Sequence, residues 1–366
     1  MREDVFIACS DLSIGYPERS TVATVVKSGL TLRALKGEMV ALIGGNGVGK
    51  STLLKTIAGF QPPLSGEILI HHRPSSSYSS AELAKELSFV STEMVRVPNL
   101  SVSELVGLGR FPYTNWLGQL NEIDKEIITN AICQVGLSGY EKRKVGKISD
   151  GERQRAMVAR ALAQDTPILV LDEPTAFLDI SNKYEIVGIL HKLAVEQGKC
   201  ILFSTHDLNT ALSIADRIWL MLDDRVVEGI PEELVSNGSL EALFPNNQHL
   251  YFDKEKGDFR IRKEKKGKVY LNASGKELIK ATKALDRIGF EVITKEAVPN
   301  ASLSVGPMAS QTMSHPAVTS DFQLKEIYAV QHEKRWILSY SGIMIEIDSL
   351  EALCRELKGI MHQRES

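Results

Sequence analysis

Residues 44–51 read GGNGVGKS, a glycine-rich run closed by a lysine and a serine. An apolar segment, Met39–Ile43, precedes this run, and a helix-forming segment from about Lys50 to Ala58 follows it. Glycines let backbone N–H groups face phosphate oxygens, and the start of the next helix adds its positive dipole. Strand, loop and helix in this order predict a phosphate-binding loop rather than a chance glycine-rich turn. The loop residues expected to contact a nucleotide are Gly44, Gly45, Asn46, Gly47, Val48, Gly49, Lys50, Ser51 and Thr52.

Four polar side chains from two segments have distinct expected roles. Lys50 would reach the β- and γ-phosphates, and the Ser51 hydroxyl would ligate Mg²⁺. Residues 168–171 (ILVL) predict a strand buried on both faces, followed directly by Asp172 and Glu173. Asp172 can hold Mg²⁺ through water, and Glu173 is placed to polarise a water for attack on the γ-phosphate. The alternative is an acidic pair that only caps the next turn.

The order of elements around these motifs indicates an α/β fold. Residues 186–194 repeat apolar side chains at helical spacing, Gly198 ends that helix, and residues 200–203 form another apolar strand. Strand, helix and strand in succession make a parallel crossover unit. A helical subdomain is expected within this core at about residues 95–165.

Composition restricts the class of protein. The chain has 366 residues, of which 43% are hydrophobic and 24% charged, and its net charge is −3. This is typical of a folded protein of about two domains, without the overall basic charge that favours nucleic acid. No apolar run approaches the roughly 18 residues of a membrane span, and residues 1–6 lack the apolar core of a secretory signal. We expect a cytoplasmic protein with no nucleic-acid partner, and the four widely spaced cysteines disfavour a zinc site.

The sequence changes in character after residue 250. Residues 253–268 (DKEKGDFRIRKEKKGK) contain eight basic against four acidic residues, which is typical of an exposed hairpin or linker. Residues 297–320 carry no charged side chain and three prolines, the composition of a flexible loop. The segments on either side of this loop suggest strands and helices. We therefore expect a nucleotide-binding domain over residues 1–250 and a small C-terminal α+β accessory domain over residues 251–366.

Residues 148–152 read ISDGE and stand just before a helix-forming segment, residues 153–163. This stretch resembles the signature motif of ATP-binding cassette (ABC) proteins, commonly LSGGQ, and it separates the chain from kinases and GTPases. The resemblance implies that two ATPase domains pair head to tail, with each ATP between the phosphate loop of one and the signature of the other. Ser149, Gly151 and Glu152 would then contact the partner's nucleotide, at a helix N-terminus that attracts anions. The alternative, an ordinary serine N-cap, is compatible with this role.

Three further residues match the ABC pattern in their order along the chain. Asp179, preceded by Leu178, resembles the loop that joins the two sites across the dimer. His206 follows its strand as the switch histidine of the family does, which implies that it bonds the γ-phosphate and orients the attacking water. Tyr16 matches the aromatic side chain that stacks on adenine. The expected catalytic residues are therefore Glu173 and, from the resemblance, His206.

Two positions depart from the family pattern. Alignment on residues 100–102 (LSV) places Thr92 where ABC proteins usually carry a glutamine that ligates Mg²⁺ and senses the membrane subunit. The Thr92 hydroxyl can still ligate the metal, so Thr92 joins Ser51 and Asp172 as an expected metal residue. Asp150 replaces a glycine of the signature. Because a carboxylate would repel phosphate, we expect the Asp150 side chain to point away from it.

One segment of the helical subdomain indicates which group of ABC ATPases the chain resembles. Residues 105–116 (LVGLGRFPYTNW) are similar to a segment of the ATPases that serve importers of iron–siderophore complexes, haem and vitamin B12. In those proteins, residues 109–113 would lie near the surface that receives the coupling helix of the membrane subunit. The alternative is a helix ended by Pro112, with Phe111 and Tyr113 filling the core.

The resemblance covers residues 5–250 and implies the ATP-hydrolysing subunit of an ABC importer for an iron complex or cobalamin. ATP and Mg²⁺ are the expected cofactors. The expected partners are multi-span permease subunits, a substrate-binding protein and a second copy of the chain, at the cytoplasmic face of the bacterial membrane. An exporter ATPase is one alternative, and a soluble ABC ATPase in translation or DNA repair is another. The soluble class usually has two cassettes, coiled-coil arms or zinc modules, and residues 1–366 suggest none of these.

Overall fold

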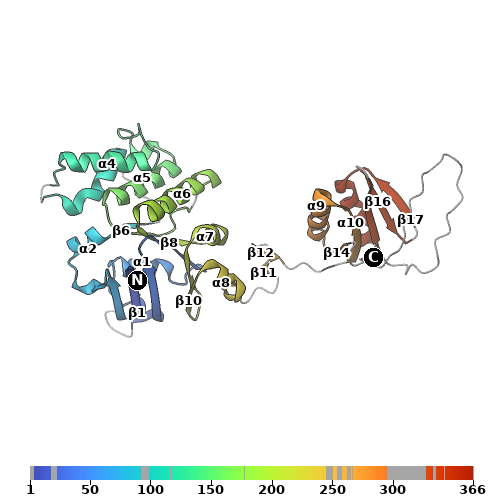
Figure 1. The fold of residues 1–366 in the computed structure, drawn as a ribbon, viewed down its shortest axis with the longest axis horizontal. Coiled ribbons are helices and arrows are strands. Elements are labelled where there is room, and N and C mark those ends of the chain that lie inside the picture. Colours follow the sequence, from blue (N-terminus) through green and yellow to red (C-terminus); the bar gives the residue numbers. More distant parts are fainter. Residues whose placement is uncertain are drawn as a thin grey trace. The chain divides into compact units, whose positions relative to one another are not determined.

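The computed structural model divides the chain into two compact units, Met1–Arg260 and Ile261–Ser366, which are described separately (Figure 1). The structure describes residues 4–17, 23–91, 99–115, 118–176, 178–244, 250–253, 258–261, 265, 267–294, 327–332, 335–341 and 343–365. Thr92 and the predicted loop at residues 297–320 lie outside these ranges. Among the described residues, no helix is long and apolar enough to cross a bilayer.

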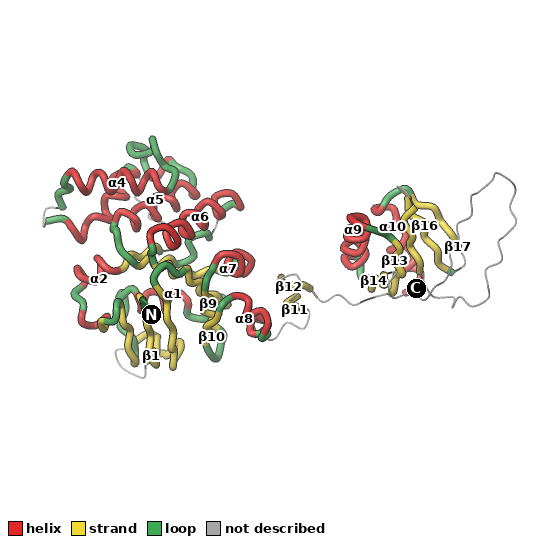
Figure 2. The backbone as a smooth tube through the Cα atoms, viewed as in Figure 1, coloured by secondary structure: helices red, strands yellow, loops and turns green. Residues whose placement is uncertain are grey.

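Two large sheets form the body of the first unit (Figure 2). The larger has the strand order β10-β9-β3-β8-β7-β6, and its neighbours are parallel except for β10 and β9. The smaller is antiparallel, with the order β2-β1-β4-β5. The parallel order confirms the predicted α/β fold. The strands are β1 (Val5–Tyr16), β2 (Thr24–Leu35), β3 (Met39–Gly44), β4 (Ser65–Ile70), β5 (Arg73–Pro74), β6 (Leu87–Val90), β7 (Ile168–Leu171), β8 (Cys200–Thr205), β9 (Arg217–Met221) and β10 (Val226–Gly229).

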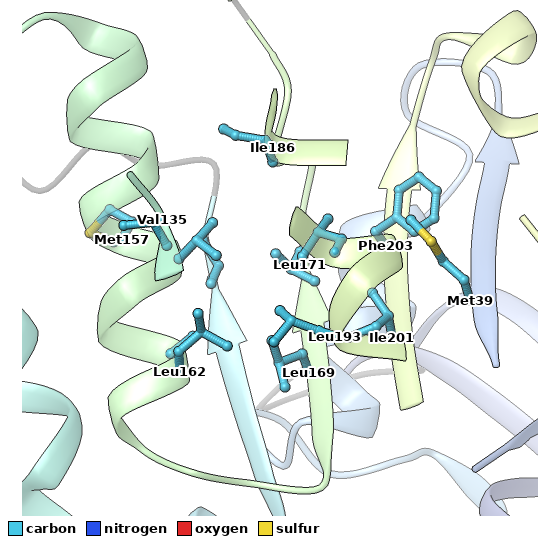
Figure 3. Packing of buried hydrophobic residues seen from close by; sticks show 14 of the residues in the cluster. Met39, Val135, Met157, Leu162, Leu169, Leu171, Ile186, Leu193, Ile201 and Phe203 are labelled. Atoms are coloured by element: carbon cyan, nitrogen blue, oxygen red, sulfur yellow. The ribbon is translucent and has the colours of Figure 1, made fainter. Parts of the chain in front are cut away.

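Successive side chains of the parallel strands enter two different cores, which explains why these strands read as continuous apolar runs. In β3, Met39 and Ala41 belong to one core and Val40 to the other. The first core also takes side chains from α5 and α6, such as Leu162 and Leu193 (Figure 3). The helices of this unit are α1 (Lys50–Ile57), α2 (Ser80–Glu86), α3 (Val102–Gly107), α4 (Glu122–Gln134), α5 (Asp150–Ala163), α6 (Ile180–Gln197), α7 (Leu208–Ile214) and α8 (Pro231–Ser236), with 3-10 turns η1 (Ser75–Ser77), η2 (Leu108–Tyr113), η3 (Val145–Lys147) and η4 (Ser239–Leu243).

A buried ion pair attaches η2 to the rest of the helical subdomain. The Arg110 guanidinium donates to Asp124 Oδ1 in α4 at 2.9 Å and to the carbonyl oxygen of Ala163 at the end of α5, also at 2.9 Å. A Cβ at Gly109 would lie 2.1 Å from the carbonyl oxygen of Arg160, so only glycine permits this approach. Breaking a buried pair of this kind leaves an uncompensated charge and is strongly unfavourable. The turn is therefore held firmly against the helix that begins at the signature.

The division between the two units falls just before the last residue of a short hairpin, β11 (Leu250–Asp253) and β12 (Asp258–Ile261). Phe252 is buried in the first core, and Phe259 packs against the same core. The two rings meet edge to face with centroids 5.1 Å apart. These apolar contacts keep the hairpin up to Arg260 with the first unit, and the second unit begins at Ile261.

The second unit is an α+β arrangement around one sheet of order β14-β13-β15-β16-β17. β13 is parallel to β14 and β15, whereas β16 is antiparallel to both of its neighbours. Leu285 and Leu357, one from each helix, pack with the sheet residues Val269 and Trp336 in a single core. The elements are β13 (Gly267–Asn272), α9 (Gly275–Arg287), β14 (Phe290–Thr294), β15 (Ile327–His332), β16 (Arg335–Tyr340), β17 (Ile343–Ile347) and α10 (Leu350–Glu365).

Candidate functional site

The predicted phosphate loop joins the end of β3 to the start of α1. Gly47 has a φ of 76° and Gly49 a φ of 112°, values that favour glycine strongly. A Cβ at Gly49 would also lie 2.4 Å from Val26 Cγ1. At Gly45 and Gly47, by contrast, a Cβ would meet nothing within 4 Å. The loop is thus packed against Val26 of β2 at Gly49, whereas the space beside Gly45 and Gly47 is open, as the approach of a phosphate requires.

Lys50 is held close to the loop that precedes it. Its ammonium donates to the carbonyl oxygens of Gly44 and Gly45, at 2.9 Å each. The residue is only 7% exposed, and this burial lowers the pKa of Lys50, while the nearby Glu173 and Asp172 carboxylates oppose that shift. The cation therefore shares its surroundings with the two acidic residues predicted to act on the γ-phosphate and the metal.

Tyr16 lies beside the first turn of α1. Its hydroxyl and Thr52 Oγ1 are 3.1 Å apart, and either atom can be the donor. Thr52 is buried, whereas Tyr16 is exposed. An exposed aromatic ring next to the phosphate loop is suited to the predicted stacking on adenine.

A hydrogen-bonded chain of three residues orders the end of β7. Ser204 Oγ donates to Asp172 Oδ1 at 2.7 Å and accepts from the Glu173 backbone N–H at 2.8 Å. Asp172 is buried, and Glu173 has a φ of 48°, a left-handed conformation that costs a non-glycine residue about 1–2 kcal/mol. Sequence reasoning assigned no role to Ser204, although it belongs to the same STHD run as His206. Ser204 holds both acidic residues in place.

The two predicted catalytic residues lie together. Nδ1 of His206 is 3.5 Å from Oε2 of Glu173. They come from loops that follow different strands of the same parallel sheet, and the carboxyl ends of neighbouring strands meet at one edge. A carboxylate beside an imidazole can take a proton from water and keep that water oriented.

The oxygen ligands predicted for Mg²⁺ fit that ion. Ser51 offers an exposed hydroxyl and Asp172 a buried carboxylate, the hard oxygen donors that Mg²⁺ prefers. The described residues contain no cluster of three or more His, Cys, Asp or Glu that could hold a metal alone. Mg²⁺ is commonly held by one or two protein groups together with substrate phosphates.

The signature serine caps its own helix and is exposed at the same time. Ser149 Oγ accepts from the Glu152 N–H at 3.2 Å, and the Glu152 carboxylate accepts from the Ser149 N–H at 2.7 Å. The bond from the Ser149 N–H, then hydrogen bonds from the Tyr140 and Ser149 side chains to the same carboxylate, lower the pKa of Glu152, and the Arg155 charge adds to that shift. The Asp150 carboxylate pairs with Arg153 at 2.6 Å, which compensates the charge that departs from the family pattern. The Glu152 carboxylate is thus committed to the cap, and its contact with nucleotide stays a prediction.

Asp179 and the signature turn are connected within one chain by Asn182. Asp179 caps α6 by accepting from the Asn182 backbone N–H at 2.8 Å and from its side-chain amide at 2.9 Å. The same amide group packs on Gly151, where a Cβ would lie 2.6 Å from its Cγ. The predicted residues therefore form two groups. Around Glu173 lie Lys50, Asp172 and His206, and around Asn182 lie Gly151 and Asp179.

The segment at residues 108–113 exposes its aromatic side chains. Phe111 is 73% exposed and Leu108 is 51% exposed. Tyr113 is partly exposed and lies against Arg110, whose guanidinium carbon is 4.1 Å from the ring centroid. The alternative in which Phe111 and Tyr113 fill the core is therefore wrong. The buried side chain of this turn is Arg110, which sequence reasoning left without a role.

Comparisons with known proteins agree on one family. Residues 28–176 match the family model described as ABC transporter. The petrobactin import ATP-binding protein FpuD of Bacillus anthracis is 36% identical over 234 residues, which are 64% of this chain and 84% of that protein. The iron(3+)-hydroxamate import ATP-binding protein FhuC of Bacillus subtilis is 34% identical over 248 residues, 68% of this chain and 90% of that protein.

Solved structures with the same fold are also ABC cassettes. A dimeric cassette in a post-hydrolysis state, bound to ADP and Pi, is 27% identical, with a TM-score of 0.55 over 62% of this chain and 98% of that one. A part of the ABC transporter complex cbiONQ from Clostridium perfringens is 27% identical, with a TM-score of 0.57 over 67% of this chain and 96% of that one. The chain belongs to the ABC transporter family, as one of its ATP-binding subunits that hydrolyse ATP with Mg²⁺.

Proposed function

We propose that this ATPase powers uptake of a ferric siderophore or a related metal complex through a multi-span permease, from the cytoplasmic face of the membrane. A substrate-binding protein would deliver the cargo. Relatives named for import or transport of petrobactin, achromobactin, iron(3+)-hydroxamate and ferric enterobactin match 64–68% of the chain at 32–36% identity. The segment at residues 105–116 supports the same cargo class.

The hydrolytic step is assigned to Glu173 and His206. Glu173 accepts a proton from the attacking water, and His206, 3.5 Å from that carboxylate, keeps the water and the γ-phosphate in line. Lys50 and the N–H groups of the loop bind the phosphates, and Ser51 and Asp172 would hold Mg²⁺. When bound, that ion neutralises charge on the phosphate oxygens.

Hydrolysis is coupled to transport through a dimer of this chain. Ser149 and Gly151 of one copy would contact the nucleotide held by Lys50 of the other, so the pair closes when both nucleotides bind. The free energy available for moving the permease is the difference in ATP affinity between open and closed pairs, because equal affinity shifts no equilibrium. Hydrolysis and phosphate release reopen the pair.

The observation that carries the importer assignment is the exposed aromatic turn η2. Phe111 is the most exposed side chain there, while Arg110 anchors the turn to α4 and α5. A rigid turn with an exposed aromatic residue is suited to bind a helix of a partner protein. A force that the partner exerts on η2 would be transmitted through Arg110 to α5, the helix that begins at the signature.

We expect Phe111→Asp to disable transport without disabling ATP hydrolysis. A charge at the centre of an apolar interface costs about 2 kcal/mol or more, roughly a thirtyfold loss of association. In the native host, a strain lacking this chain should lose uptake of a radioactive ferric siderophore. The natural chain should restore that uptake, whereas the variant should restore about a tenth or less. Purified Phe111→Asp should hydrolyse ATP at the natural rate.

Val195→Asp is the matched control, because Val195 is similarly exposed on α6, away from this turn. It should restore uptake fully. Unchanged siderophore uptake in the strain without the chain would overturn the cargo class. Full restoration by Phe111→Asp would overturn the docking role of η2.

A further inference from the structure

The first turns of α6 contact two functional loops of the same chain. Asp179 caps the helix, and the backbone N–H of Lys183 donates to the carbonyl oxygen of Asp179 at 3.0 Å. Asn182 packs on Gly151 of the signature. The next side chain, Lys183, forms an ion pair with Asp207, the residue after His206. One helical turn therefore joins the loop predicted to face the partner to the loop that carries the switch histidine.

Both oxygens of the Asp207 carboxylate accept hydrogen bonds. Oδ1 accepts from the backbone N–H of Thr210 at 3.1 Å, and Oδ2 accepts from the Thr210 hydroxyl at 2.9 Å. The Asp207 N–H donates to Thr205 Oγ1 at 3.0 Å. Thr205 and Thr210 belong to β8 and α7, so they fix Asp207 within its own loop. Lys183 adds a contact from another part of the chain, and its side chain is only 19% exposed.

His206 itself is much less enclosed. Its side chain is 64% exposed, and Nδ1 lies 3.5 Å from Glu173 Oε2, longer than a good hydrogen bond. The backbone of His206 must therefore place the imidazole, and the neighbouring Asp207 is anchored by three hydrogen bonds.

We propose that Lys183 is a positioning residue for ATP hydrolysis, which acts through Asp207 to keep His206 in line with Glu173. This inference rests on the proposed role of His206. Because Lys183 lies one turn after Asp179, movement of the α6 N-terminus against the partner is transmitted to the switch loop of the chain's own site. Hydrolysis at each site then depends on how the pair has closed.

The first test replaces the ammonium but keeps the length of the side chain. Lys183→Met should lower kcat for ATP about 10- to 100-fold, the scale of a displacement of about 1 Å in a catalytic group, and leave KM within about twofold. Lys183→Arg should restore most of the rate. Lys192→Met is the matched control, since Lys192 pairs with Glu196 on the exposed part of the same helix, and it should leave kcat unchanged.

The second test separates positioning from general destabilisation. In a His206→Ala background, Lys183→Met should have no further effect on the residual rate, because its only route to the chemistry is gone. Asp207→Asn keeps an oxygen for the α7 cap but removes the charge, so it should reproduce the Lys183→Met defect even if that variant folds poorly.

A natural kcat in Lys183→Met, or an equal loss of rate with and without His206, would overturn the inference. Failure of the natural chain to hydrolyse ATP would instead overturn the assigned function, so the two failures are distinguishable.

Discussion

Glu173→Gln should leave ATP binding intact and lower turnover roughly 10²–10⁴-fold, the usual effect of a lost acid–base group. The amide has the shape of the carboxylate but cannot accept a proton from water. The neighbouring contacts that position residue 173 do not require the charge, because Ser204 bonds its backbone N–H. ATP should therefore stay bound, and the closed pair should persist.

The rate is measured by phosphate release at saturating MgATP, and binding by equilibrium titration with a fluorescent ATP. Glu196→Gln is the control, since it removes an exposed carboxylate on α6 that pairs with Lys192. This variant should hydrolyse ATP at the rate of the natural chain. A Glu173→Gln protein that hydrolyses ATP at the natural rate would show that another group takes the proton.

Lys50→Ala should weaken nucleotide binding itself. The ammonium sits among the loop carbonyls of Gly44 and Gly45, close to the acidic pair Asp172 and Glu173. A charge-assisted hydrogen bond to phosphate contributes about 1.5–3 kcal/mol, so its loss should raise Kd for ATP roughly 10- to 150-fold.

Calorimetric titration with MgATP measures that change in Kd. Lys55→Ala on the same helix is the control, because Lys55 lies in the last turn of α1, away from the loop. An unchanged Kd in Lys50→Ala would contradict the assignment of residues 44–51 as the phosphate loop.

The nucleotide-binding loop and the acidic pair could be predicted because their evidence is local. In residues 39–58, strand, glycine turns and helix follow each other without interruption, so tertiary packing adds little. The apolar run at residues 168–171 likewise implies the doubly covered strand observed in β7. The ABC resemblance then placed Glu173 and His206 in one catalytic site, a relation between distant segments that no local pattern encodes.

What sequence reasoning missed depends on contacts between distant segments. The burial of Arg110 requires Asp124 from α4 and the carbonyl of Ala163, which lie 14 and 53 residues further along the chain. Nothing in residues 105–116 alone identifies arginine as the inward side chain. Gly151 and Asn182 meet only because α5 packs on α6. For the same reason, the contact by which Lys183 joins the start of α6 to the Asp207 loop could be found only from the fold.

If each nucleotide is bound between two copies of the chain, the signature of one copy contacts the γ-phosphate held in the phosphate loop of the other. A Ser149→Cys, Lys50→Ala double variant cannot hold nucleotide in its own loop but carries a thiol at its signature. It is mixed with the natural chain and an ATP analogue that bears a thiol-reactive group on the γ-phosphate, and the label on the introduced cysteine is measured by mass spectrometry. The double variant alone gives the background from native cysteines, of which Cys133 is exposed. We predict strong labelling of the introduced cysteine in the mixture and background labelling in the variant alone. Background labelling in both would contradict a nucleotide bound between two copies.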